Sequence, residues 1–236
     1  MADDGIVIEG ASKRFASFVA LRSIDLRIGG GQFVLLAGAN GAGKSTLLRL
    51  MAGISRPSSG RVLIAGQDPQ RHATARASIG LLSHHTLLYD DLSADENLTF
   101  FARLYALPDA AQRVDEALEQ VGLTEHRHRR LRGFSRGMRQ RLALARATLH
   151  RPAILLLDEP FTGLDQPACD ALSARLSALK ATDSNCVLVT HRLEEAAELA
   201  DRLVVLGRGR ICHDGAWSGS LQALVDTCAP FLGALR

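Results

Sequence analysis

Short apolar runs alternate along the chain with segments in which apolar residues recur every three or four positions. Apolar runs are expected of strands buried on both faces of a parallel sheet, and the longer spacing is expected of helices that pack on one side. The runs are residues 33–37, 79–82, 153–157, 186–189 and 203–206, and helical segments cover about residues 44–52, 167–180, 192–200 and 219–228. The pattern predicts an α/β fold with a mainly parallel sheet core.

The first part of the chain departs from this alternation. Residues 5–9 and 21–28 have the composition of strands, and in the second of these segments Ile24 and Leu26 alternate with polar residues. Such alternation is typical of a strand with one buried face. We therefore expect an antiparallel β flank, and a further strand over residues 61–64 after a turn.

Residues 86–149 are predicted to be almost entirely helical. A capping box beginning at Ser93 opens the first helix, Pro108 starts the second, and Ser135 caps the third. We expect these helices to form a helical subdomain inserted into one domain that covers residues 1–236. The predicted helices are residues 94–105, 108–122 and 136–149.

The stretch from Gly38 to Ser45 fits the pattern G-x-x-x-x-G-K-[ST] at every fixed position. A loop that turns its N–H groups inward around phosphates needs backbone conformations that glycine adopts cheaply. We expect Lys44 to reach the β- and γ-phosphates of a nucleotide and Ser45 to ligate Mg2+. The alternative is a glycine-rich turn that matches by chance. The predicted nucleotide-binding residues here are Gly38, Ala39, Asn40, Gly41, Ala42, Gly43, Lys44, Ser45 and Thr46.

Two acids end the apolar run at residues 153–157. Asp158 is predicted to hold the Mg2+ ion through its water shell, and Glu159, which points elsewhere, to polarise a water against the γ-phosphate. His191 follows another predicted strand, at the sheet edge where ligands collect in open α/β folds. The alternatives are a helix-capping turn for the two acids and a structural role for the histidine.

The composition and charge of the chain limit the classes of function that it can have. The chain has 236 residues, is 47% hydrophobic and carries a formal net charge of +3, which suits one α/β domain with an insertion.

The basic run at residues 126–132 lacks interleaved aromatics, so a solvated face is favoured over a nucleic-acid patch. The four dispersed cysteines make a metal or redox role a weak hypothesis. No apolar run approaches the roughly 18 residues of a membrane span, and the acidic start is unlike a signal peptide, so we expect a soluble chain whose membrane role comes through a partner.

The order of these motifs resembles the ATPase domain of ATP-binding-cassette (ABC) transporters along essentially the whole chain. The segment from Phe134 to Arg141 is similar to the signature L-S-G-G-Q of that family, and the segment from Gly163 to Asp165 resembles its D-loop. By the same resemblance, His191 corresponds to the switch histidine. Without the resemblance, Phe15 would be interpreted as a core residue. By the resemblance, it corresponds to the aromatic that stacks on adenine.

The resemblance implies a mechanism that needs two copies of the chain. ATP bound at the Lys44 loop of one copy is closed over by Ser135 and Gly137 of the other, in a head-to-tail homodimer. Glu159 and His191 organise the attacking water. The implied cofactors are ATP and Mg2+, and the implied partners are integral membrane permease subunits, with no nucleic acid. The implied location is peripheral, at the cytoplasmic face of the membrane.

The chain also departs from the pattern of the family. His84 stands where a glutamine usually contacts Mg2+ or water, and Arg136 and Met138 replace the first glycine and the final glutamine of the signature. The segment from Ser83 to Leu92, together with F-S-R-G-M, resembles the ATPase subunit of the cytochrome c maturation haem exporter. The alternatives are a drug, polyketide or polysaccharide exporter, a soluble ABC protein linked to nucleic acid, and a nucleotide-binding scaffold without turnover.

Overall fold

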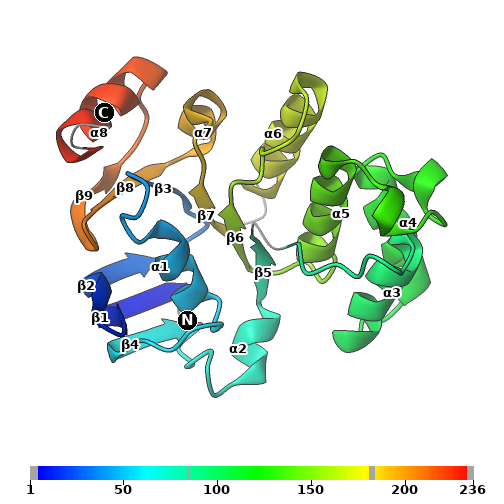
Figure 1. Cartoon of the computed structure of the whole chain (residues 1–236), viewed down its shortest axis with the longest axis horizontal. Coiled ribbons are helices and arrows are strands. Elements are labelled where there is room, and N and C mark those ends of the chain that lie inside the picture. The colour runs from blue at the N-terminus through cyan, green and yellow to red at the C-terminus, as the bar shows by residue number, and fades with distance from the viewer. Residues whose placement is uncertain (1–4, 84–85, 181–183, 233–236) are drawn as a thin grey trace.

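The computed structural model describes residues 5–83, 86–180 and 184–232, and this part of the chain contains two sheets with helices packed on them (Figure 1). The larger sheet has the strand order β5-β6-β7-β3-β8-β9. The first five of these strands are parallel, and β9 pairs antiparallel with β8. The strands are β3 (Phe33–Gly38), β5 (Ile79–Leu82), β6 (Ile154–Asp158), β7 (Asn185–Val189), β8 (Arg202–Gly207) and β9 (Arg210–Ala216).

The central strands are buried on both faces, which explains their continuous apolar sequence. Successive side chains of a strand point to opposite faces, so each strand contributes to two cores. On β3, Val34 and Leu36 belong to a first core, whereas Phe33 and Leu35 belong to a second core on the other face.

The smaller sheet is antiparallel, with the strand order β2-β1-β4. Its strands are β1 (Ile6–Phe15), β2 (Phe18–Ile28) and β4 (Ser59–Ile64). Helix α1 (Lys44–Met51) contributes Leu47, Leu48 and Met51 to the first core, together with side chains of both sheets. The predicted antiparallel flank is thus packed across α1 from the parallel sheet.

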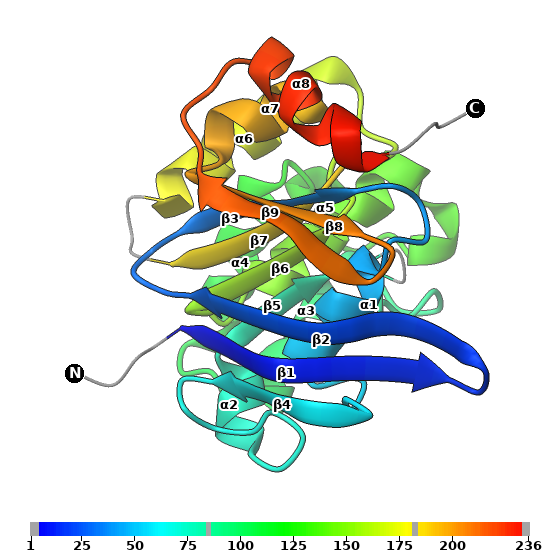
Figure 2. The same cartoon turned by 90° about the vertical axis from the view of Figure 1, so that its left-hand side faces the viewer.

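The second core is covered by helices from the last part of the chain. Figure 2 shows α6, α7 and α8 on one side of the larger sheet and the smaller sheet on the other. Cys169 and Leu176 of α6, Leu199 of α7 and Leu224 of α8 are buried against the strands. These helices are α6 (Gln166–Lys180), α7 (Leu193–Leu199) and α8 (Leu221–Leu232).

Three helices form a separate group beside the larger sheet, coloured green in Figure 1, with a third core of their own. We refer to α3 (Ala94–Leu104), α4 (Ala110–Gln120) and α5 (Arg136–Thr148) as the three-helix group. The predicted capping box is present: the N–H of Glu96 donates to Ser93 Oγ at 3.1 Å, and the N–H of Ser93 donates to the Glu96 carboxylate at 2.7 Å.

The edge strand β5 is held by side chains at the end of α5 and just beyond it. Arg146 Nη2 donates to the carbonyl oxygen of Leu81 at 2.5 Å, and His150 Nε2 lies 3.1 Å from the carbonyl oxygen of Ile79. The imidazole of His150 also stacks on Tyr105, with ring centroids 4.1 Å apart. The free edge of the sheet is thereby tied to the three-helix group.

Several element boundaries differ from the predictions. The helix expected to start at Pro108 begins at Ala110, because Asp109 adopts the left-handed φ of +54°. Strands β1 and β2 are longer than predicted, because their hairpin pairing continues to Phe15 and Phe18. Strand β9 and the short helix α2 (Ala73–Ala77) were not predicted. The half-exposed β9 depends on its pairing with β8 rather than on an apolar pattern.

Candidate nucleotide site

The loop between β3 and α1 has the glycine-dependent backbone that the motif predicts. Gly38, Gly41 and Gly43 have φ values of +146°, +79° and +110°. A Cβ atom on Gly43 would lie 2.7 Å from Leu21 Cδ2, and one on Gly38 would collide with the carbonyl oxygen of Leu206. Conformation and space therefore both require glycine at the first and last of these positions.

Lys44, the first residue of α1, bends back over this loop. Its Nζ donates to the carbonyl oxygen of Gly38 at 2.6 Å and to that of Ala39 at 3.0 Å. Burial lowers the pKa of the Lys44 ammonium, while the nearby carboxylates of Glu159 and Asp158 act in the opposite direction. The side chain is thus held at the mouth of the loop, where phosphate oxygens can replace the two carbonyl oxygens.

The loop forms one wall of a cavity of about 300 Å³ whose other wall is the carboxyl ends of β6 and β7. The N-terminus of α1 opens into it, and free N–H groups at a helix start favour anions. The lining residues are Phe18, Ala20, Asn40, Gly41, Gly43, Lys44, Ser45, Thr46, Asp158, Glu159, Val189 and His191.

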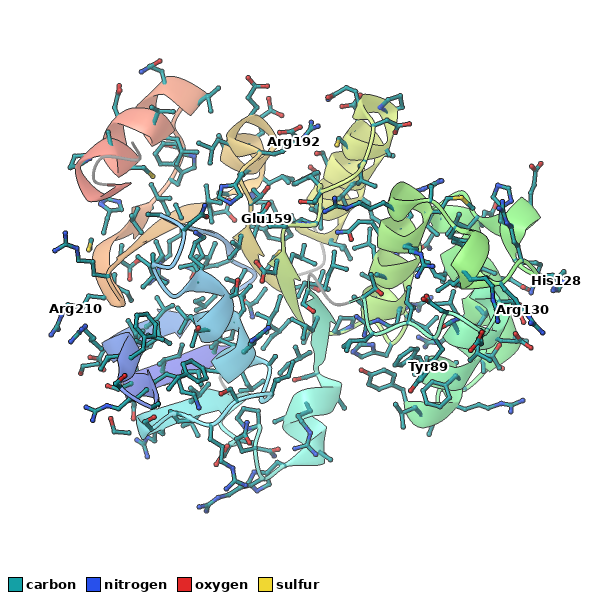
Figure 3. The ribbon with its side chains drawn as sticks, in the orientation of Figure 1. Tyr89, His128, Arg130, Glu159, Arg192 and Arg210 are labelled. Atoms are coloured by element: carbon teal, nitrogen blue, oxygen red, sulfur yellow. The ribbon has the colours of Figure 1, made fainter. Side chains whose placement is uncertain are left out.

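The side chains of the two acids at the end of β6 point in different directions, as predicted from their adjacent positions in the sequence. Asp158 is buried, with 7% of its surface exposed, and pairs with Val189 of β7. Glu159 adopts a left-handed φ of +56°, while its N–H still donates to the carbonyl oxygen of Val189 at 2.8 Å. Figure 3 shows Glu159 near the centre of the molecule, at the junction of α1, β6 and β7.

Glu159 is held by His191. The N–H of His191 donates to Glu159 Oε2 at 3.2 Å, and its ring Nε2 lies 3.4 Å from Oε1. Burial raises the pKa of the Glu159 carboxyl, and the contacts with His191 oppose that rise. A carboxylate with a raised pKa beside a phosphate-sized cavity has the chemistry of a general base.

Mg2+ fits the donors in the cavity. Within the described ranges no cluster of three or more His, Cys, Asp or Glu residues could hold a metal ion by itself. Mg2+ on a nucleotide keeps several waters and takes only one or two protein oxygens, besides phosphate oxygens. The Ser45 hydroxyl and the Asp158 carboxylate line the same cavity and can supply them. His84, the third predicted metal contact, lies outside the described residues.

The aromatic side chain that lines this cavity is Phe18, not Phe15. The two residues pair directly across the β1-β2 hairpin, so their side chains share one face, and both are exposed. Lys13 lies over one face of the Phe15 ring, with its Nζ 5.0 Å from the ring centroid. Sequence reasoning missed Phe18 because its position depends on the hairpin register; the pair of phenylalanines flanking a two-residue turn was the available signal.

Ser135, Gly137 and Asp165 lie elsewhere. They line a second cavity, of about 670 Å³, between the start of α5 and the start of α6, and none of them lines the Lys44 cavity. Ser135 Oγ accepts the N–H of Met138 at 3.2 Å, as the predicted helix cap requires. Asp165 Oδ1 accepts the N–H of Ala168 at 3.1 Å and so caps α6. Within one copy of the chain these residues are not brought to the phosphate loop.

A residue that sequence reasoning missed connects the two regions. Gln140 of α5 donates from Nε2 to the carbonyl oxygens of Glu159 and Pro160, at 3.2 and 3.0 Å. The backbone that carries the candidate base is therefore tied directly to the helix that begins at Ser135.

Known proteins with similar sequences bear on this site. Residues 21–162, more than half of the chain, match the family model described as ABC transporter. The chain is 40% identical over 218 residues to the daunorubicin resistance ATP-binding protein DrrA3 of Streptomyces coeruleorubidus, covering 91% of this chain and 69% of that protein. It is 42% identical over 210 residues to the sulfate/thiosulfate import ATP-binding protein CysA of Thermosynechococcus vestitus, covering 88% of this chain and 62% of the relative.

Solved structures agree with this relationship. An ATP-binding subunit of an ABC transporter superposes with a TM-score of 0.85 at 30% identity, over 98% of this chain and 95% of that one. The ATP-binding cassette MJ0796, a dimer in a post-hydrolysis state bound to ADP and Pi, shares the fold with a TM-score of 0.83 at 24% identity, over 91% of this chain and 99% of that one. The chain belongs to the ABC transporter family, as an ATP-hydrolysing nucleotide-binding domain.

Proposed function

We propose that this chain is the nucleotide-binding subunit of an ABC exporter and that it hydrolyses MgATP between the Lys44 loop and the ends of β6 and β7. The observation that carries the proposal is the convergence of Lys44, Ser45, Asp158, Glu159 and His191 on one cavity of about 300 Å³. These residues come from three separate parts of the sequence, and each has the chemistry that phosphoryl transfer to water requires.

Each side chain then has a defined role. The loop N–H groups and Lys44 bind the phosphates. Ser45 and Asp158 would hold Mg2+, which when bound would neutralise charge on the phosphates. Glu159 accepts a proton from the attacking water, and His191 orients the Glu159 carboxylate and contacts the γ-phosphate end of the cavity. Phe15 and Phe18 provide apolar faces for the nucleoside at the hairpin tip.

We further propose that two copies act head to tail, with Ser135, Gly137 and Asp165 of each copy completing the site of the other. The separation of Ser135 from the Lys44 cavity within one copy supports this arrangement. Ser135 stands at a helix start, where its hydroxyl and free N–H groups can face an anion together. The dimeric state of the related cassette MJ0796 is consistent with it.

The partners are proposed to be integral membrane permease subunits, with the ATPase peripheral at the cytoplasmic face. Among the described residues, none of the helices has the length and apolar character needed to span a bilayer. Four exposed apolar side chains supply a docking surface: Phe100 and Leu104 lie one turn apart on α3, Tyr89 contacts Phe100 with ring centroids 5.2 Å apart, and Leu87 precedes it. We propose that residues 86–149, as an inserted helical subdomain of a domain spanning residues 1–236, carry this surface and transmit the closure of the dimer.

For the transported molecule we propose haem or a haem-handling step in cytochrome c maturation, on the resemblance of Ser83–Leu92 and F-S-R-G-M stated above. A second candidate, export of a drug or other small hydrophobic molecule, is supported by the 40% identity with a daunorubicin resistance protein. The ATPase sites of the two candidates are alike, so the membrane partner distinguishes them.

The test is affinity purification of Glu159→Gln from native membranes with ATP present, followed by identification of the retained proteins and measurement of haem absorbance. Lys44→Ala, purified in parallel, is the control that lacks nucleotide-dependent closure. Recovery of cytochrome c maturation subunits supports the haem proposal, and recovery of an unrelated permease supports the drug-exporter proposal. A monomer without ATP-dependent partners would contradict both.

A further inference from the structure

A third cavity, of about 690 Å³, lies on the side of the three-helix group that faces α6, and it shares no residue with the Lys44 cavity. Its walls are one face of α4, the end of α5 with the segment that joins it to β6, the start of β6, and the second half of α6. Apolar side chains form much of it, namely Ala117, Leu149, Pro152, Leu155, Ala178 and Leu179.

Arg175 of α6 stands between this cavity and the 670 Å³ cavity that contains Ser135, because it lines both. Its Nη2 donates to Thr148 Oγ1 at 2.8 Å, and the Thr148 hydroxyl in turn donates to the carbonyl oxygen of Leu144 at 3.0 Å. Arg175 Nη1 is shielded from solvent and has no hydrogen-bond partner. One donor edge of a half-buried guanidinium is therefore unsatisfied.

The charge of Arg175 is not balanced within the described part of the chain. Burial lowers the pKa of its guanidinium, and no carboxylate opposes that effect. Arg202 differs: two bonds to the Asp214 carboxylate, at 2.6 and 2.7 Å, raise its pKa despite partial burial. A donor of a charged group that is shielded from water and has no partner is costly, so the Nη1 of Arg175 is suited to bind an anion.

The surroundings of Arg175 favour a negative ligand. Among the residues that the structure describes, Arg113 and Arg151 also line the 690 Å³ cavity, against the single acid Glu116. Arg113 Nη1 reaches only the carbonyl oxygen of Leu149, at 3.5 Å, and Arg151 pairs loosely with Glu116 at the rim, at 3.5 Å. Three arginines therefore line a cavity whose other lining residues are mainly apolar.

We propose that this cavity binds an anion with an apolar body, whose charged group is held by Arg175 Nη1 and whose body packs on Leu149, Leu155 and Leu179. Such a ligand contacts α6, which begins beside Asp165, and the end of α5, which begins at Ser135. A bound ligand fixes the position of α5 and α6 relative to each other. It thereby adjusts the surface at the start of these helices, where Ser135, Gly137 and Asp165 lie. Binding itself does not depend on the proposed transport function.

The probe is anilinonaphthalene sulfonate, which joins a sulfonate to apolar rings and gains fluorescence in apolar sites. It is titrated into the full chain saturated with ADP, so that the Lys44 cavity is occupied. We expect one saturable site per chain and weakening of the affinity by about tenfold or more in Arg175→Gln, since a hydrogen bond to a charged group is lost. Arg71→Gln removes the same charge from an exposed position and should leave the affinity unchanged.

Ala178→Trp is the second test, because it fills the cavity without altering any charge. It should weaken binding of the probe as well, while the affinity for ADP stays at the parent value and thermal unfolding stays cooperative. Should Arg175→Gln fail to fold, this variant decides the outcome. The proposal is overturned by an affinity that is unchanged in Ala178→Trp or in folded Arg175→Gln, or by the absence of saturable probe binding in the ADP-saturated chain.

Discussion

Glu159 and His191, which are 32 residues apart in the chain, make two contacts with each other. The backbone N–H of His191 donates to Glu159 Oε2 at 3.2 Å, and the ring Nε2 of His191 lies 3.4 Å from Glu159 Oε1. Glu159 itself adopts a left-handed backbone conformation, which costs free energy in a residue with a side chain. The contacts from His191, and the backbone bond to Val189, hold the carboxylate in the cavity in spite of that cost.

Replacement of Glu159 by glutamine should uncouple binding from turnover. Glutamine keeps an oxygen that accepts the N–H of His191, but it cannot take a proton from water. We expect ATP affinity to be retained and the steady-state rate of phosphate release to fall by about 100-fold or more. Size-exclusion chromatography should detect a dimer with ATP and a monomer without it. Turnover near the parent rate would remove Glu159 as the base.

The same substitution should stabilise the fold at neutral pH. Burial raises the pKa of Glu159, so its contribution to stability is present below the ordinary carboxyl pKa, about 4.3, and is lost as pH rises through the folded pKa. Because 27% of the Glu159 side chain is exposed to solvent, we expect a gain below about 1 kcal/mol, or less than about 4 °C in Tm. Calorimetry from pH 3.5 to 8 should show this gain vanish at low pH, and a constant gain would argue for a packing effect.

The paired phenylalanines predict different losses of nucleotide affinity. Phe18 lines the cavity, whereas Phe15 pairs with it across the hairpin and has Lys13 over one face of its ring. Loss of an aromatic ring that contacts a base costs about 1–3 kcal/mol, so Phe18→Ala should weaken ATP binding by about fivefold or more. Calorimetric titrations of Phe18→Ala and Phe15→Ala compare the two positions directly. An unchanged affinity in Phe18→Ala would leave Phe15 as the stacking residue.

His150 should make stability depend on pH. Burial lowers its pKa to about 4, so the folded chain binds fewer protons than the unfolded chain between pH 6.5 and 4. Its contribution is thus complete above pH 6.5 and is lost as pH falls towards 4, by about 1–3 kcal/mol. His150→Phe retains a ring against Tyr105 but cannot titrate. Denaturant unfolding of both proteins at pH 7 and pH 4.5 should show a smaller loss in the variant.

His84, which lies outside the described residues, carries a prediction from the sequence alone. A histidine can bind Mg2+ or accept a hydrogen bond from water only when its imidazole is neutral, and its ordinary pKa is about 6.5. We expect ATPase activity to fall on acidification towards pH 6 and the fall to be weaker in His84→Gln. The two proteins differ only at residue 84, so the difference between their pH-rate profiles isolates His84. Identical profiles would contradict the assignment.

Much of the fold follows from local patterns. The buried strands are readable because each carries apolar side chains to two cores, and the capping box at Ser93 works through residues only three apart. The phosphate loop is equally local: the glycines set the backbone between β3 and α1, and Lys44 returns to carbonyl oxygens five and six residues away. Such interactions join residues that are close in the chain, so they can be predicted from short segments of the sequence.

The remaining features depend on contacts between distant segments. The register of the β1-β2 hairpin sets Phe18 rather than Phe15 against the cavity, and pairing with β8 makes a strand of the polar segment 210–216. Gln140 reaches the backbone of Glu159 only because α5 packs beside β6. No periodicity of the sequence encodes these relationships.

The sequence by itself determined the family motifs, the α/β order and the residues able to bind phosphate and activate water, since all of these are properties of short segments. Only the tertiary structure decided that Glu159 and His191 touch, that Ser135 stands apart from Lys44 in one copy, and that the half-buried Arg175 has a shielded Nη1 and no counter-ion among the described residues. Distance and burial arise when remote segments pack, so the chain order alone could not reveal them.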